Sequence, residues 1–375
     1  MPCSVTSDVV DVFLSLATVQ SPSGAERPVA DLAAGYLREL DLEVSEDAAG
    51  GALRGDAGNL YCRIPATDGN GGLPLFFCAH MDTVPPDGRL EPVVEDGVAR
   101  NAGGTILGCD NKAAITAMLE GTRRVLAENV PHAGIELVFT PMEEVGLLGA
   151  GAFAADRLRA QVGYVYDQEG PMGEVVLGAP WSRALEVRFH GRSAHAGMAP
   201  EEGRSAIQAA AKAIADLRLG RVDELTTANV GVISGGTTGN VVPEWCSFQA
   251  EARSHDEATL GEVVQEMLDA FSFAATETEC DVETTMRKSY DGYRLKRDEP
   301  AVALAAAAFA RCGFEPRYGL SGGGADANVF NGRGLRCVNL SHGVFGFHTP
   351  GEHVSVADLE AMVDVTVALV ESARA

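Results

Sequence analysis

The sequence predicts an α/β protein in which a smaller α+β domain is inserted into a larger one. Strands and helices alternate through the first half of the chain, which is typical of a largely parallel sheet. The middle of the chain changes to the order strand, helix, strand, strand, helix, strand, which matches a ferredoxin-like unit. The length of 375 residues also exceeds that at which a single hydrophobic core usually stops growing.

The elements of the first half follow from hydrophobic periodicity and turn residues. Residues 8–42 predict two helices separated by a turn at 21–24. Short apolar runs bounded by turn residues then predict strands, and a longer amphipathic segment predicts a helix between two of them. The strands are expected at 60–64, 73–79, 135–140 and 164–167, and the helix at 112–128.

The inserted domain is expected at residues 179–293, and the larger domain at 1–178 and 294–375. Within the insert, strands are expected at 185–191, 229–234, 247–253 and 282–287, and helices at 205–217 and 257–275. The larger domain then resumes with a helix at 299–312, a Gly-rich loop at 321–324, a strand at 338–340 and a helix at 356–373. No strand is expected before that loop, which argues against a dinucleotide-binding enzyme.

Composition excludes several classes of partner. Lys and Arg total 29 against 53 Asp and Glu, a formal charge of −24, which repels nucleic acid and anionic membranes. The N-terminus has no basic region of the kind that opens a signal peptide, and no apolar stretch is long enough to span a bilayer. Eight cysteines are scattered without CxxC pairs. We therefore expect a cytoplasmic protein with reduced thiols.

His80 and Asp82 directly follow an apolar strand, at the end where α/β sheets carry their chemistry. His80 suits a metal ion as neutral imidazole, and Asp82 is spaced to accept its other ring N–H. Asp110 stands where a helix begins, and taken alone it fits an N-cap better than a metal ligand.

The adjacent acids Glu143 and Glu144 follow the next strand with no cation beside them, an arrangement that is costly unless a metal ion neutralises it. Asp167 ends a further strand, and His348 follows a glycine-bounded turn late in the chain. Any one of these residues could be a surface acid or a structural histidine. Together, from separate loops, they indicate a metal site.

These residues stand in motifs that resemble the M20 family of metallopeptidases along the whole chain, with closest similarity to peptidase T-like tripeptide aminopeptidases. The motifs occur in family order: SPSGAE, HMDTV, GCDNKAA, MEEVG, YDQEG, SAHAG and HTPGEH. The resemblance implies a mixed-sheet di-metal exopeptidase catalytic domain at residues 1–178 and 294–375. Residues 179–293 would then be a ferredoxin-like lid and dimerisation domain.

The resemblance also implies a role for each candidate residue. His80 and Asp167 would hold one metal ion, Glu144 and His348 the other, and Asp110 would bridge the pair. Two histidines with three carboxylates suit zinc, and also cobalt or manganese. Two such ions lower the pKa of a bound water and polarise the scissile carbonyl. Glu143 would be the general base that passes the proton to the leaving amine.

The resemblance also implies that residues outside the metal site bind the substrate. His195, in SAHAG, would donate to the oxyanion, in the family often across a dimer interface, so we expect a homodimer through the lid. Asn240 and Arg253 would hold the substrate, although Arg253 could instead form a structural ion pair. Gly323 would let backbone approach the substrate. Asn111 departs from the Asp common in peptidase T-like sequences, which bears on the subfamily more than on the chemistry.

The expected activity is metal-dependent hydrolysis of a peptide bond in a di- or tripeptide at its N-terminus. An N-acyl amino acid amidohydrolase of the same family is the alternative, because it uses identical metal chemistry. A non-catalytic metal-binding member is a further alternative, against which the presence of Glu143 and all five ligands argues.

Overall fold

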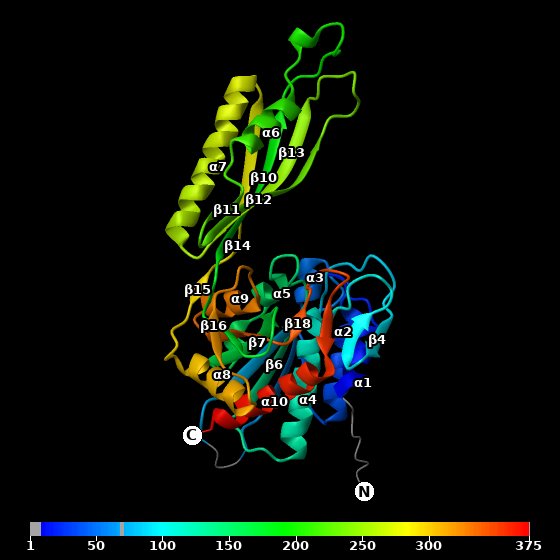
Figure 1. The fold of residues 1–375 in the computed structure, drawn as a ribbon, viewed down its shortest axis with the longest axis vertical. Helices are drawn as coiled ribbons and strands as arrows, with labels where there is room; N and C mark the ends of the chain where they lie inside the picture. The colour runs from blue at the N-terminus through cyan, green and yellow to red at the C-terminus, as the bar shows by residue number, and fades with distance from the viewer. Residues whose placement is uncertain (1–8, 68–70, 375) are drawn as a thin grey trace. The chain divides into compact units, whose positions relative to one another are not determined.

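The computed structural model describes residues 9–67 and 71–374. Cys3 and residue 8, with which the first predicted helix begins, lie outside these ranges. The chain forms two compact units, one extending to Ala179 and resuming at Arg294, the other comprising Pro180–Tyr293. Figure 1 shows the elements of both units.

The first unit is built on an eight-stranded mixed sheet. Its strands, in spatial order, are β1 (Val44–Glu46), β2 (Leu60–Ile64), β6 (Ile135–Thr140), β3 (Leu75–His80), β7 (Val162–Gln168), β17 (Arg336–Ser341), β8 (Glu174–Val176) and β16 (Arg317–Gly319). The four central strands β6, β3, β7 and β17 are parallel. Their carboxyl ends therefore lie along one edge of the sheet, where ligands bind in α/β folds.

Helices cover both faces of this sheet. They are α1 (Val9–Ala17), α2 (Arg27–Glu39), α3 (Ala49–Leu53), α4 (Cys109–Ala127), α5 (Leu148–Ala152), α8 (Pro300–Arg311), α9 (Asp326–Gly332) and α10 (Val356–Ser372), with a 3-10 turn at Ala155–Arg157. Successive strand residues point to opposite faces. Phe76 accordingly meets Phe330 of α9, whereas Tyr166 bonds to Thr366 of α10 on the other side. Because the central strands are covered on both faces, every residue of β3 and β6 is buried.

Two smaller pairings complete the first unit. A four-stranded sheet joins β18 (Val344–Phe345), β19 (His353–Ser355), β5 (Val98–Asn101) and β4 (Pro92–Glu95), and β9 (Gly178–Ala179) pairs with β15 (Tyr293–Arg294). The prediction that no strand precedes the Gly-rich loop is wrong, since β16 and α9 flank it. That strand has three residues, too few for an apolar pattern to mark it.

The second unit is a five-stranded antiparallel sheet with two helices on one face. Its strands, in spatial order, are β11 (Gly220–Asp223), β12 (Thr226–Gly235), β13 (Trp245–Ser254), β10 (Trp181–His190) and β14 (Asp281–Tyr290), and its helices are α6 (Ala206–Ala215), α7 (Glu257–Thr278) and the 3-10 turn Pro200–Glu202. Alternate residues such as Phe189 and Phe248 pack beneath the helices. The predicted fold class, with its ferredoxin-like strand order, is confirmed. The edge strand β11 and the 3-10 turn were not predicted.

Within the described ranges, no helix is long and apolar enough to cross a membrane. The seven cysteines that the structure describes are all free thiols.

Candidate metal centre

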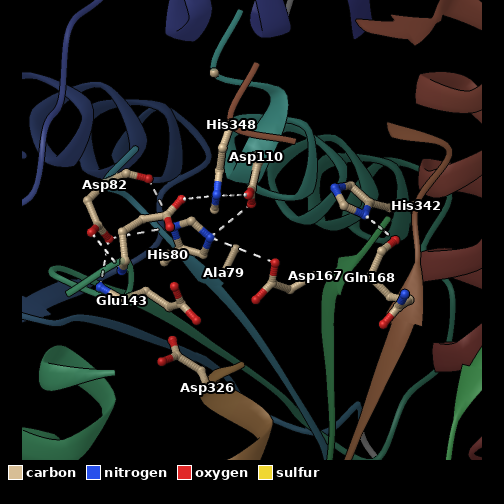
Figure 2. A network of polar contacts seen from close by, with 12 residues as sticks. Ala79, His80, Asp82, Asp110, Glu143, Asp167, Gln168, Asp326, His342 and His348 are labelled. Carbon is tan, nitrogen blue, oxygen red and sulfur yellow. Dashed lines mark hydrogen bonds and ion pairs between the residues drawn. The ribbon is translucent and has the colours of Figure 1, made fainter. Parts of the chain in front are cut away.

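The carboxyl ends of three parallel strands bring the first predicted ligands together. His80 is the last residue of β3, Asp167 lies near the end of β7, and Glu143 and Glu144 follow β6 directly. His80 is almost fully buried, and its Nε2 lies 3.1 Å from Asp110 Oδ1 and 4.0 Å from Asp167 Oδ1. Figure 2 shows the side chains of His80, Asp110, Glu143 and Asp167 converging.

Asp110 lies between the two histidines. Its Oδ1 faces His80, and its Oδ2 lies 3.2 Å from Nε2 of His348. The N-cap of α4 is Gly108, and the Asp110 backbone is not helical although it lies in the first turn. The interpretation of Asp110 as a capping residue is therefore wrong. Its two oxygens are turned to different histidines, as a bridging carboxylate requires.

His348 and Glu144 form the second half of the cluster. His348 Nε2 lies 3.0 Å from Glu144 Oε1, and both side chains lie around Asp110. Ligand atoms fall within 4.8 Å of one another in three groups: His80, Asp110 and Asp167; Asp110, Glu144 and His348; and His80, Glu143 and Glu144. The first two groups correspond to the two predicted metal sites and share Asp110.

Asp82 contacts His80 and the backbone of both glutamates. The Nδ1 atom of His80 lies 2.9 Å from the backbone oxygen of Asp82 and 3.5 Å from its Oδ1. The carboxylate of Asp82 also accepts hydrogen bonds from the backbone N–H groups of Glu143 and Glu144, at 2.9 and 3.1 Å, and from the Ser23 hydroxyl at 2.7 Å. The predicted contact with the imidazole is thus made mainly by the main chain, while the carboxylate orders the two acids.

The charges of the cluster suit cations. Hydrogen bonds that the His348 imidazole donates to the carboxylates of Asp110 and Glu144 raise its pKa to about 10. Burial opposes a charged His80, yet its bonds to Asp110 and Asp82 hold its pKa well above the usual value. Among the described residues, the cluster's carboxylates form ion pairs with histidines but with no Lys or Arg. Imidazole and carboxylate donors so arranged fit divalent ions, which displace the histidine protons on binding.

Glu143 has the properties of a proton acceptor. It is buried, and burial together with the charge of Asp167 raises its pKa well above the ordinary value of a glutamate. Its carboxylate faces that of Asp326 at the start of α9 (Figure 2). Asp326 is itself buried and accepts hydrogen bonds from Thr140 and Cys78. Bound cations would lower the pKa of Glu143 again and leave it as a base.

A model of peptidase family M20/M25/M40 matches residues 76–372, most of the chain and all of this cluster. The chain belongs to peptidase family M20/M25/M40. Family membership makes it a peptidase by descent, and the two overlapping ligand groups are its candidate metal centre.

Solved structures of M20 peptidases resemble the whole chain. The aminopeptidase PepT from Bacillus cereus is 37% identical, with 98% of each chain covered and a TM-score of 0.87. A tripeptidase from Staphylococcus aureus is 34% identical, with 97% of each chain covered and a TM-score of 0.91. The protein YqjE of Bacillus subtilis is 36% identical over 97% of this chain and 98% of its own.

The second unit brings two of its three predicted residues together. The backbone N–H of Ala196 donates to the Asn240 carbonyl at 3.0 Å, and His195 forms a bridge with Val241. His195 is exposed, and its Nδ1 accepts hydrogen bonds from the backbone N–H groups of Gly197 and Met198. The neutral ring therefore carries its proton on Nε2, the form that can donate to an oxyanion.

Arg253 lies at the opposite end of that unit. Arg253 is the next-to-last residue of β13, whereas the segments that carry His195 and Asn240 adjoin the first residue of that strand, Trp245. Along an extended strand, Trp245 and Arg253 are about 27 Å apart. The Nη2 atom of Arg253 forms an ion pair with Glu251 at 2.9 Å. Gly323, in the first unit, lies in the loop before α9, where its N–H donates to Ser321.

Three further buried residues at the centre were not among the predicted site residues. Glu26 accepts hydrogen bonds from the backbone of Gly24 and Met142, and Glu352 holds the backbone around Asp110. His342 donates from Nδ1 to the Gln168 carbonyl (Figure 2). Glu26 and Glu352 stand inside quoted motifs, so their position was a signal. Nothing in the sequence distinguishes His342 from a structural histidine.

Proposed function

We propose that the protein is a metal-dependent aminopeptidase that hydrolyses di- and tripeptides. The observation that carries the proposal is the cluster of two histidines and three carboxylates with Glu143 beside it at the carboxyl edge of the sheet. The substrate class is supported by the aminopeptidase and tripeptidase that resemble the whole chain at 37% and 34% identity.

In this proposal His80 and Asp167 hold one cation, His348 and Glu144 hold the other, and Asp110 bridges them. We propose zinc as the metal, with cobalt and manganese as substitutes, because mixed imidazole and carboxylate donors suit these ions. Bound there, the cations supply a water of lowered pKa and polarise the scissile carbonyl.

Glu143 then carries the proton. Its carboxylate is buried beside the ligands, close enough to accept a proton from an attacking water and deliver it to the leaving amine. The Asp82 carboxylate fixes the positions of Glu143 and Glu144 by accepting hydrogen bonds from their backbone N–H groups. Gly323 belongs to the loop that we place beside the substrate.

We further propose a homodimer in which His195 and Asn240 serve the metal centre of a second copy. Arg253 lies near the point where the chain enters the second unit, since its neighbour Ser254 pairs with Trp181. His195 and Asn240 lie at the far end. This separation supports different roles for the two ends of the unit: Arg253 would bind substrate, and His195 would donate to the oxyanion. We expect the dimer in the cytoplasm, in keeping with its free thiols.

An N-acyl amino acid amidohydrolase remains the second candidate, because the same metal centre can cleave either amide. The test is hydrolysis of a tripeptide, its N-acetylated form and an N-acyl amino acid by chelator-treated protein, before and after zinc, cobalt or manganese is added. We expect metal-restored cleavage of the free tripeptide at its first bond and no cleavage of the acetylated form. Cleavage of the N-acyl amino acid alone would assign the deacylase activity instead, and a chain that binds metal without cleaving any of the three would be a non-catalytic member.

A further inference from the structure

Glu352 is a buried acid next to the candidate metal centre, with a side chain that is 2% exposed. It follows His348 by four residues and directly precedes β19. It belongs to none of the ligand groups and forms no ion pair with a described residue. An acid so deeply buried requires partners of another kind.

Those partners are three backbone N–H groups of the loop that carries Asp110. Glu352 Oε2 accepts from Leu107 and from Gly108, both at 2.8 Å, and Oε1 accepts from Asp110 at 2.9 Å. Hydrogen bonds to a carboxylate are stronger than those between neutral groups. Without Glu352, three N–H groups would be buried with no acceptor at the start of α4.

The opposite end of Glu352 is fixed to the turn that carries His348. The Thr349 N–H donates to the Gly346 carbonyl and the Glu352 N–H to the Thr349 carbonyl, both at 3.1 Å. Gly346 has φ +75°, and a Cβ there would lie 2.9 Å from the Gly351 oxygen, so only glycine fits this tight turn. His348 and Glu352 therefore belong to one hydrogen-bonded turn.

We propose that Glu352 is a positioning residue that sets the separation between the Asp110 carboxylate and the His348 imidazole, and with it the spacing of the two cations. One carboxylate joins two ligand-bearing loops that are more than 240 residues apart in the chain. The inference rests on the proposed function, because it assumes that Asp110 and His348 both bind metal.

Glu352→Gln tests the proposal, with Glu136→Gln as the matched control. Glu136 is equally buried and accepts backbone N–H groups from Arg159 and Ala160 at 2.9 and 2.7 Å. It lies at the start of β6, at the opposite end of that strand from the metal centre. Both oxygens of Glu352 accept backbone N–H groups, so the amide NH2 of Gln must face at least one of them. At Glu136 the NH2 can instead replace Oε1, which accepts the Tyr61 hydroxyl, so this control changes a buried acid to its amide without removing a backbone acceptor.

The readouts are cobalt affinity, from the visible absorption of the chelator-treated full chain titrated with Co²⁺, and kcat and KM on a tripeptide. We expect Glu352→Gln to bind cobalt about 10- to 100-fold more weakly and to lose kcat by a similar factor with little change in KM. Glu136→Gln is expected to keep wild-type cobalt affinity. Wild-type affinity in Glu352→Gln, or equal losses in both variants, would overturn the proposal.

Amide hydrogen exchange on the wild-type chain gives a test that does not depend on the variant folding. The N–H groups of Leu107 and Gly108 are expected to be protected even after chelation, because Glu352 holds them. Exchange at the rate of an open loop would overturn the positioning role. A wild-type chain that binds cobalt but cleaves no peptide would contradict the proposed function. It would leave the role of Glu352 testable, because that role is measured by cobalt affinity.

Discussion

Glu143 is the residue on which turnover is expected to depend most. Its carboxylate lies within 4.8 Å of the candidate ligand atoms of His80 and Glu144, and burial together with the charge of Asp167 raises its pKa. We expect Glu143→Ala to keep the fold and the bound metal while kcat falls by about 10²- to 10⁴-fold, the usual contribution of a general base. Metal analysis and peptide hydrolysis on one preparation check this, and loss of both ions would assign Glu143 as a ligand instead.

His132 gives a pH dependence that is independent of the metal centre. It is 3% exposed, and burial lowers the pKa of its imidazole below 6.5. Below about pH 6.5 the unfolded chain therefore binds a proton that the folded chain resists, so stability falls as pH falls, by at most about 1.4 kcal/mol per pH unit.

His132→Leu removes this titration and is expected to flatten the dependence of the urea midpoint between pH 7.5 and pH 5. The wild-type protein under the same conditions is the reference. Identical pH slopes in the two proteins would show that His132 titrates in the same way when folded and unfolded.

At the residue scale, the residues of the candidate metal centre could be predicted from the sequence because they stand at strand ends and in spaced motifs. Asp110 taken alone has the local sequence of a cap, and its prediction as a metal ligand came from the family motif. The structure places its two oxygens beside His80 and His348. Glu26 and Glu352 were not predicted as site residues, although both stand in the quoted motifs, because the sequence does not show whether an acid is buried. Their burial depends on chain segments far away in sequence.

At the scale of elements, the long apolar patterns predicted the structure closely. The strands at 60–64 and 135–140 have the predicted bounds, and the helix expected at 112–128 is α4 (Cys109–Ala127). Short elements such as β11, β16 and the strands of the small sheet were not predicted from the sequence. Strands of two to four residues are held by pairing with distant partners, and they contain too few residues for a period to show.

The core of the second unit provides a stability prediction at this scale. Phe248 of β13 is buried and packs against Phe189 and against Phe271 of α7, with ring centroids 6.2 and 5.3 Å apart. We expect Phe248→Ala to lower the free energy of unfolding by about 3 to 5 kcal/mol. Phe273→Ala, at a 58% exposed position on α7, is the matched control, with an expected change within about 0.5 kcal/mol. Equal changes would contradict the assigned core.

The homodimer proposal belongs to the whole molecule and predicts complementation between inactive variants. His195→Ala and Glu143→Ala are each expected to be inactive alone. If His195 serves a neighbour's site, the mixed dimer contains one site with both residues intact, so an equimolar, subunit-exchanged mixture is expected to regain about a quarter of wild-type activity. Sedimentation of the mixture checks that dimers have formed. A mixture that stays inactive would assign His195 to its own chain.

The order of the ligands along the chain has a consequence for biosynthesis. His80 and Asp110 leave the ribosome before Pro180–Tyr293, whereas His348 and Glu352 emerge after the whole of that unit. The inserted unit has only its own contacts to form and can fold while translation continues. The larger unit must wait for β17 to enter between β7 and β8, a pairing of high contact order and therefore slow. A nascent chain thus acquires its complete set of candidate ligands only after the inserted unit has been synthesised.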